Sequence, residues 1–149
     1  MANPTPRLLD AMDAFEDGIY IVSENYTVEY MNKYMVSLFG PGVGKKCYTV
    51  LNQSDGPCPW CNYQEIFKKN KTHRERVYVP SVEKYFDLTE LPVTNSDGSR
   101  SKLSIYRDIT DTLQQEKRFE SSKESYQRLF KYVGCGVFIS SKAGRFLDV

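Results

Sequence analysis

The end of the chain repeats a segment near its start. Residues 136–149 align without a gap with residues 18–31, and both stretches contain two short runs of β-branched and aromatic residues separated by a polar break. Such runs are typical of β-strands. With 149 residues, the chain has room for one ordinary domain core but scarcely for two. We therefore expect one complete domain, a connecting segment, and the truncated start of a second copy.

The first copy continues in a definite order of elements. Residues 18–22 and 28–31 predict a pair of strands, and apolar residues at helical spacing then run from Asn32 to Gly40. Residues 64–71 suit a further helix. Alternating patterns from Arg74, over 85–93 and over 102–106 predict three antiparallel strands, and the turn signal at 95–98 joins the last two. The expected order is two strands, helices and three strands.

Helices are also predicted on both sides of this unit. An N-cap signal at Thr5 opens a short amphipathic helix that should end near Glu16. Its apolar face consists of Leu8, Met12 and Phe15. Residues 108–131 lack glycine and proline and predict one long charged helix. The second half of this helix carries a weak or interrupted coiled-coil seam, formed by Phe119, Ser122, Tyr126, Leu129 and Val133.

These elements, in this order, resemble the PAS family of sensor domains. The resemblance rests on Gly18-Ile19-Tyr20-Ile21-Val22, on the second strand at 28–32, on the three closing strands and on Asp108-Ile109-Thr110. It implies an α+β fold, with a five-stranded antiparallel sheet in the order 2-1-5-4-3, short helices on one face, and a long linker helix after the sheet. The implied domains are an N-terminal amphipathic helix (1–17), a PAS domain (18–109), a signalling linker helix (110–133) and the truncated start of a second PAS domain (134–149).

The resemblance also implies a regulatory role. The chain would be a cytoplasmic sensory input domain of a bacterial signal-transduction protein, with a histidine kinase preferred over a diguanylate cyclase as the output. It would detect a small ligand or a redox state and relay the signal through a dimeric linker helix, and no particular cofactor is implied. The alternative is a dimerisation or protein-interaction module with a filled core and no ligand. Because the sequence has no glycine-rich phosphate-binding loop, we expect no catalytic activity from this chain.

Three of the four cysteines crowd into one short interval, at Cys47, Cys58 and Cys61. They can fill core space, form a redox-active pair, or bind a metal. A metal ranks below a redox pair, because three thiolates need a fourth ligand such as His73 or Cys135. We expect Cys58 to open a helix, where exposed N–H groups would lower the pKa of its thiol. A thioredoxin-like oxidoreductase is disfavoured, because strands and helices do not alternate.

Aromatic side chains supply candidates for a ligand pocket. Those most suited to line the sheet or its covering helices are Tyr20, Tyr30, Phe39, Tyr48, Phe67 and Tyr106. At the end of the last strand, Asp108 and Thr110 can cap the first free N–H groups of the long helix. The resemblance makes this cap the point where a signal leaves the domain.

The net charge and the hydropathy of the chain limit the kinds of partner that we expect. A net charge of +1 gives no electrostatic reason to expect nucleic acid, and no run of apolar residues is long enough to predict a membrane span. We therefore expect no direct membrane contact. The coiled-coil seam and the N-terminal amphipathic helix predict a homodimer formed through helices, and the PAS resemblance implies a small-molecule ligand. His73, the single histidine, precedes an alternating strand pattern and is interpreted as a surface strand residue.

Overall fold

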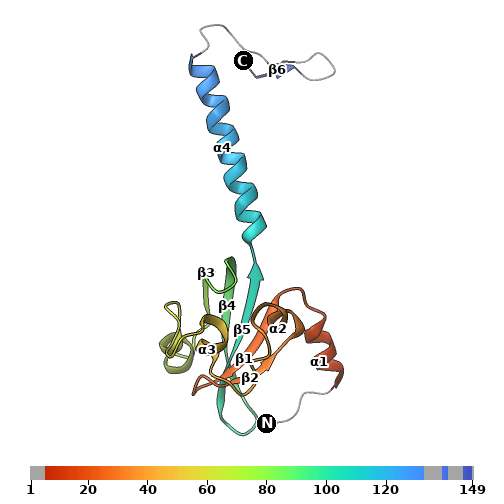
Figure 1. Ribbon diagram of the computed structural model, residues 1–149, viewed down its shortest axis with the longest axis vertical. Coiled ribbons are helices and arrows are strands. Elements are labelled where there is room, and N and C mark those ends of the chain that lie inside the picture. Colours follow the sequence, from red (N-terminus) through yellow and green to blue (C-terminus); the bar gives the residue numbers. More distant parts are fainter. Residues whose placement is uncertain (1–5, 133–138, 141–145, 149) are drawn as a thin grey trace. The chain divides into compact units, whose positions relative to one another are not determined.

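The computed structural model describes residues 6–132, 139–140 and 146–148. The chain divides into two compact units, Met1–Thr110 and Asp111–Val149 (Figure 1). The first unit contains α1 (Pro6–Asp13), β1 (Gly18–Ser23), β2 (Val28–Met31), α2 (Lys33–Phe39), α3 (Cys47–Asn52), the π-helical turn η1 (Gln64–Lys68), β3 (His73–Val79), β4 (Lys84–Thr94) and β5 (Arg100–Asp108).

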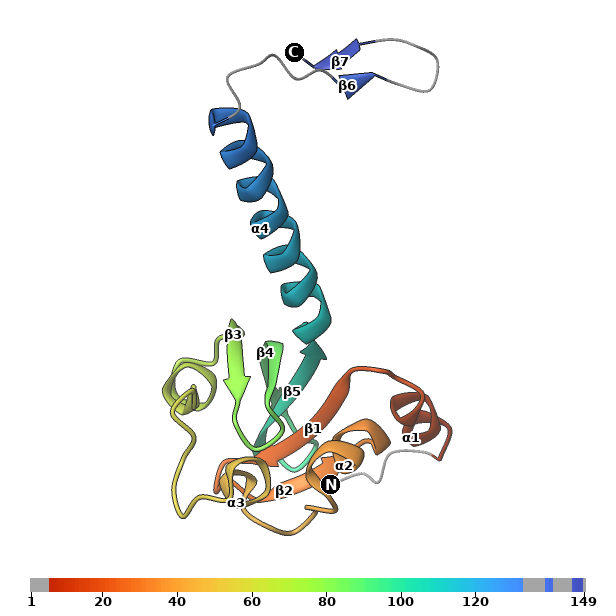
Figure 2. The same cartoon turned by 45° about the horizontal axis from the view of Figure 1, so that its top comes forward.

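The five strands form one sheet in the order β2-β1-β5-β4-β3, with every neighbouring pair antiparallel (Figure 2). This confirms the predicted fold class and strand order. The register places Tyr20 opposite Ser104, Ser104 opposite Glu90, and Glu90 opposite His73. One row of side chains with polar groups therefore runs across four strands.

Helices cover the face of the sheet to which this row belongs. Met35 of α2, Leu51 of α3 and Ile66 of η1 are buried together with the alternate apolar residues of the strands. A Cβ atom on Gly18 would lie 2.5 Å from the sulfur of Met35, so glycine is what allows α2 to approach β1 this closely. The burial of this face supplies the hydrophobic stabilisation of the domain.

Asn32 joins three elements at one end of the sheet. Its side-chain oxygen accepts hydrogen bonds from the N–H groups of Met35 and Ile19, at 3.1 and 3.0 Å. Its side-chain nitrogen donates to the carbonyl oxygens of Met12 and Asp17, at 3.1 and 3.0 Å. Fully buried, this residue is the N-cap of α2 and also ties α1 to β1.

The helix predicted to run to Glu16 ends at Asp13. The Met12 carbonyl, which a longer helix would use for the Glu16 N–H, instead accepts a hydrogen bond from Asn32. The carboxylate of Asp13 accepts from the N–H of Lys33 at 3.0 Å. Tertiary hydrogen bonds therefore end α1 one turn early, and no residue of this helix is fully buried.

The helix expected to begin at Cys58 is also absent at that position. Residues 58–61 form a turn in which the Cys61 N–H donates to the Cys58 carbonyl at 2.9 Å, and η1 begins only at Gln64. Pro59 removes a backbone N–H from this stretch. The prediction that Cys58 lies at a helix N-terminus is therefore wrong.

Helix α4 (Thr110–Tyr132) begins at the last residue of the first unit, and its other residues belong to the second unit. The second unit also contains the short strands β6 (Ile139–Ser140) and β7 (Phe146–Asp148), which pair antiparallel. α4 is the predicted long helix, and its apolar residues Phe119 and Leu129 are 73% and 62% exposed. Most of the predicted second domain copy, including Cys135, lies outside the described residues. Within the described residues, no helix is long and apolar enough to cross a membrane.

Candidate functional site

A buried ion pair lies on the helix-covered face of the sheet. The ammonium of Lys102 on β5 lies 2.5 Å from the carboxylate of Glu90 on β4, and the two side chains are only 8% and 2% exposed. The hydroxyl of Ser104 donates to the same carboxylate oxygen at 3.3 Å. Burial alone would lower the pKa of Lys102, but the charge and hydrogen bond of Glu90 outweigh it and raise that pKa above its ordinary value. Lys102 is therefore charged at neutral pH.

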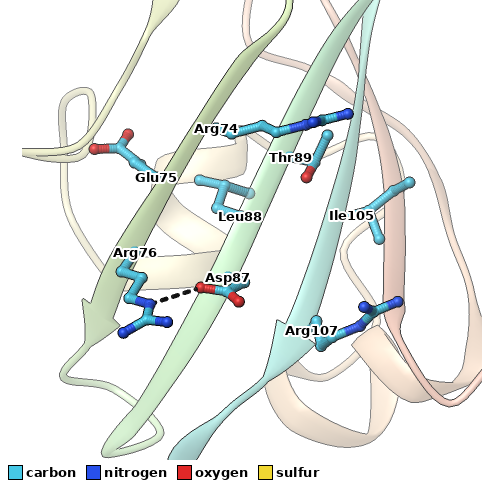
Figure 3. A pocket seen from close by; sticks show the side chains of 8 residues that line it. All are labelled: Arg74, Glu75, Arg76, Asp87, Leu88, Thr89, Ile105 and Arg107. Carbon is cyan, nitrogen blue, oxygen red and sulfur yellow. Dashed lines mark hydrogen bonds and ion pairs between the residues drawn. The ribbon is translucent and has the colours of Figure 1, made fainter.

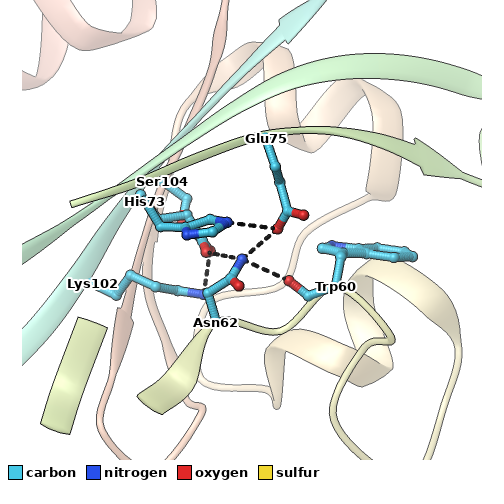
Figure 4. Close-up of polar contacts among 7 residues, drawn as sticks. Trp60, Asn62, His73, Glu75, Lys102 and Ser104 are labelled. Carbon is cyan, nitrogen blue, oxygen red and sulfur yellow. Dashed lines mark hydrogen bonds and ion pairs between the residues drawn. The ribbon is translucent and has the colours of Figure 1, made fainter. Parts of the chain in front are cut away.

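A turn covers this ion pair. We call residues 57–62 the lid turn, because Pro57, Cys58, Trp60 and Cys61 line a cavity against the sheet. The lid turn is fastened by Asn62, whose side-chain nitrogen donates to the Trp60 carbonyl at 2.9 Å and to Glu90 at 3.2 Å. The same nitrogen also donates to Glu75 of β3 (Figure 4). One amide thus bridges the lid turn to two strands.

His73 lies at the edge of this network. Its Nε2 atom is 3.4 Å from the carboxylate of Glu75, yet it has no hydrogen-bond partner within the described part of the chain. The distance meets the limit for an ion pair but not the geometry of a hydrogen bond. The side chain is half-buried and faces the network (Figure 4), so the interpretation of His73 as a plain surface residue is wrong.

The cavity beneath the lid turn is almost filled. The centre of a water-sized sphere can occupy only about 10 Å³ of it, which is room for about one water molecule. Its walls combine aromatic, thiol and charged groups: Tyr20, Tyr26, Cys47, Leu51, Pro57, Cys58, Trp60, Cys61, Glu90, Lys102 and Tyr106.

All three cysteines of the predicted constellation line this cavity. Cys47 comes from α3, and Cys58 and Cys61 come from the lid turn, and all three are free thiols. Burial, followed by the neighbouring Cys47 and Cys61, raises the pKa of the Cys58 thiol to about 12. Burial likewise raises the pKa of Cys47. The expected lowering of the Cys58 pKa is therefore contradicted, because no helix N-terminus lies there to stabilise a thiolate.

Metal binding has no geometric support in the described residues, where no group of three or more histidine, cysteine, aspartate or glutamate side chains could hold a metal ion.

The lid turn itself is compact, since a turn of four residues brings its end Cα atoms within about 7 Å. That separation is compatible with a disulfide between Cys58 and Cys61.

The predicted pocket aromatics separate into two groups. Tyr20 and Tyr106 line the cavity, with ring centroids 5.6 Å apart, and burial raises the pKa of both phenols well above the ordinary value. The other four do not line it. Tyr30 donates to Asp13 at 3.3 Å, Tyr48 packs on Tyr26, Phe67 packs on Tyr63, and Phe39 packs on the edge of the core.

The predicted exit of the domain has the expected cap. A carboxylate oxygen of Asp108 accepts a hydrogen bond from the N–H of Thr110 at 2.9 Å, and the other oxygen accepts from Lys84 on β4. The hydroxyl of Thr110 accepts from the Tyr85 N–H at 3.0 Å instead of capping the helix. Burial opposes ionisation of Asp108, but hydrogen bonds from Lys84 and Thr110 bring its pKa below the ordinary value.

A second hollow lies on the opposite, open face of the sheet. It measures about 600 Å³ and is lined by side chains that include Arg74, Thr89 and Arg107 (Figure 3). Arg76 and Asp87 form an ion pair across it at 3.1 Å, but the two side chains are 63% and 48% exposed. A broad hollow with solvated charges offers little desolvation to a small ligand, so the enclosed cavity is the better candidate.

Sequence reasoning missed the polar residues that organise the cavity: Asn62, Glu90, Lys102 and Ser104. A signal for two of them was available. Glu90 is in phase with Phe86 and Leu88, and Lys102 is in phase with Tyr106, so both charges fall on the apolar side of alternating strands. A charged residue at an inward position predicts a buried pair.

Comparisons with known proteins bear on the fold. No protein-family profile and no curated protein sequence matches the chain. Among solved structures, the PAS domain of nitrogen regulation protein NR(II) from Vibrio parahaemolyticus is similar with a TM-score of 0.57 at 14% identity, covering 70% of this chain and 100% of that one.

Two further structures agree. The PAS domain of BvgS from Bordetella pertussis gives a TM-score of 0.53 at 16% identity, covering 80% of this chain and 96% of that one. A domain of an HTR-like protein from Haloarcula marismortui gives 0.51 at 20% identity, covering 64% and 100%. At these identities the likeness concerns the fold alone. Together with the strand order, it shows that the first unit of this chain has the PAS fold.

Proposed function

We propose that this chain is a sensory input domain of a signal-transduction protein, with a histidine kinase as the output, and that the cavity beneath the lid turn is where the signal is detected. A further structure of similar fold is a PAS domain from a two-component sensor histidine kinase, which supports this choice of output. The proposal assigns detection to the first unit, catalysis to a domain other than this one, and a cytoplasmic location to both.

One observation carries the proposal: β5 bears both the cavity and the cap. Lys102, Tyr106 and Asp108 alternate along one face of this strand, and the Asp108 carboxylate holds the first N–H of α4. A change in the position of Lys102 can therefore alter the end of the same strand six residues later. Strand β5 is hydrogen bonded to β4 and β1, so such a change is transmitted along a packed element.

The proposed signal is either a ligand or the oxidation of cysteines. Oxidation would convert the Cys58 and Cys61 thiols to a disulfide, with hydrogen peroxide as the oxidant and two water molecules as the product. The raised pKa of the Cys58 thiol makes it a poor nucleophile while the cavity is closed. Opening of the lid turn is then a condition for oxidation, which couples the chemistry to a conformational change.

The proposed relay is a dimer formed through the helices. α4 exposes Phe119, Tyr126 and Leu129, whose spacing follows a coiled-coil seam, and α1 exposes Leu8. Pairing of these faces between two copies would bury apolar surface that one copy leaves in solvent. A dimeric helix is a suitable output because a change at its first turn alters both chains.

A second candidate function is a dimerisation or protein-interaction module with no ligand. The small size of the cavity favours this alternative, because about 10 Å³ holds no ligand larger than water. The two functions differ in what happens when the lid turn is modified. A pure interaction module should tolerate the change without any effect on an attached output.

A grafted kinase tests the proposal. Residues 1–132 are joined in helical phase to the dimerisation and catalytic domains of a histidine kinase, and autophosphorylation is measured before and after treatment with hydrogen peroxide. We expect a change that dithiothreitol reverses and that Cys58→Ser abolishes, while Cys47→Ser retains it. A kinase that responds identically in all three forms, or not at all, would contradict the redox form of the proposal.

A further inference from the structure

The cavity contains an ammonium group with unused hydrogen-bonding capacity. Lys102 donates to Glu90 at 2.5 Å, and within the described part of the chain Glu90 is the one hydrogen-bond acceptor of this side chain. An ammonium carries three N–H donors. Buried donors in native proteins are almost always hydrogen bonded. The cavity therefore requires an acceptor, supplied by a water molecule when closed and by a ligand when open.

The charge of the site limits what that ligand can be. Glu90 and Lys102 neutralise each other, and both are almost completely buried. An anionic ligand on Lys102 would leave Glu90 without its counter-charge, and a cationic ligand on Glu90 would do the same to Lys102. A neutral molecule with a carbonyl oxygen meets the free donors of Lys102 at no such cost.

The second carboxylate oxygen of Glu90 requires a hydrogen-bond donor on the ligand. It accepts from Asn62 at 3.2 Å, and Asn62 belongs to the lid turn. When the lid turn moves away, this oxygen loses its donor. A ligand N–H adjacent to the carbonyl would replace the Asn62 amide, because Glu90 and Lys102 are diagonal neighbours on adjacent strands with their charged groups in contact.

Aromatic rings determine the shape of the ligand. Tyr20, Tyr26, Trp60 and Tyr106 all line the cavity, and flat walls of this kind favour a planar ring that stacks on them. The closed cavity holds about one water molecule. Binding therefore requires displacement of the lid turn, which is fastened to the sheet through the Asn62 side chain.

We propose that the open cavity binds a neutral, planar nitrogen heterocycle with a ring N–H next to a ring carbonyl, the carbonyl accepting from Lys102 and the N–H donating to Glu90. This inference rests on the proposed function, since it names the class of ligand for the same cavity. The polar edge it requires is that of a cyclic amide, and 2-pyridone is the smallest probe that carries it.

Binding is measured on the whole chain by NMR, with the indole N–H of Trp60, the single tryptophan, as the reporter. We expect 2-pyridone to shift this signal in a saturable way. N-methyl-2-pyridone, which lacks the donor, should bind at least about tenfold more weakly, because it leaves Glu90 without a partner. If benzoate binds as tightly as 2-pyridone, the requirement for a neutral ligand is wrong. If N-methyl-2-pyridone binds as tightly as 2-pyridone, the proposed hydrogen bond from the ring N–H to Glu90 is wrong. If no probe binds, the whole proposal is overturned.

Two variants locate the site. Asn62→Ala removes the fastening of the lid turn and should tighten 2-pyridone binding about tenfold, because the open state becomes more populated. Glu90→Gln should weaken it, and an unchanged affinity in both variants would place the probe elsewhere and overturn the assignment. The NMR measurement does not involve a kinase. A failed ligand series therefore leaves an oxidant response of the grafted kinase standing, and a failed oxidant response leaves ligand binding standing.

Discussion

Glu90 and Lys102 lie on adjacent strands with their charges 2.5 Å apart, and their side chains are only 2% and 8% exposed. Within the described residues, each of these side chains forms its one ion pair with the other, so removal of one partner leaves the other buried and unpaired. We expect Lys102→Met to lower the free energy of unfolding by about 3–5 kcal/mol. Urea unfolding followed by circular dichroism measures this change.

The matched control is the exposed pair of Arg76 and Asp87. Arg76→Met should cost less than about 1 kcal/mol, because solvent screens that pair. The double variant Lys102→Met with Glu90→Leu should recover most of the lost stability, since it removes both charges. Equal costs for Lys102→Met and Arg76→Met would show that the inner pair is not desolvated.

The Asp108 cap should make stability depend on acidity. Since the folded pKa of Asp108 is lower than its ordinary value of 3.8, the carboxylate contributes stability that is complete above the unfolded pKa and is lost as the pH falls through the folded one. Asp108→Asn removes the charge that pairs with Lys84 and should therefore cost up to about 1 kcal/mol at neutral pH. The difference from the unmodified protein should shrink below about pH 4.

Asp55, which is exposed on a loop, provides the control for that series. Asp55→Asn should leave the unfolding free energy unchanged to within about 0.5 kcal/mol at every pH. A neutral effect of Asp108→Asn at pH 7 would mean that the negative charge of Asp108 does not contribute to stability.

Thiol reactivity should report the state of the lid turn. A Cys58 pKa of about 12 predicts iodoacetamide labelling at neutral pH roughly 10²- to 10³-fold slower than that of an unfolded peptide thiol. Asn62→Ala should accelerate it by opening the cavity. Peptide mass spectrometry gives the rate at each cysteine, with the urea-unfolded protein as the reference. Rapid labelling of Cys58 in the native protein would contradict a closed cavity.

The exposed apolar positions of α4 predict self-association. Leu129→Asp places a charge on the seam and should weaken the dimer by about tenfold or more, whereas Gln127→Asp adds the same charge off the seam and should have little effect. Sedimentation equilibrium distinguishes the two. A chain that is monomeric at all concentrations, with or without these substitutions, would rule out the helical dimer.

Much of the fold could be predicted because it depends on local patterns. Alternation located β3, β4 and β5, and Asn32 and Gly40 set the limits of α2 as the capping rules require. The cap at Asp108 followed from its place after the last strand. In these cases the residues that decide the structure are close together in the sequence.

The predictions were wrong where residues that are distant in the sequence determine the local structure. Asn32 ends α1 through hydrogen bonds to residues 15 and 20 positions earlier, and no local pattern shows this. The local sequence of the lid turn predicted the start of a helix. The turn is instead held by hydrogen bonds from Asn62 to Glu75 and Glu90, which are distant in the sequence. The spacing of the cysteines identified a cluster, but the pKa of Cys58 depends on burial, which spacing does not report.

The central claim is that the cavity and the start of α4 are coupled through β5. Hydrogen exchange at the Thr110 amide, which donates to Asp108, measures that coupling directly by NMR. Asn62→Ala changes the cavity without touching Asp108, and we expect it to increase the exchange rate of this amide severalfold, while Arg76→Met on the open face does not. Identical Thr110 exchange in the unmodified protein and in Asn62→Ala, with the lid turn shown to be open by faster labelling of Cys58, would contradict the account.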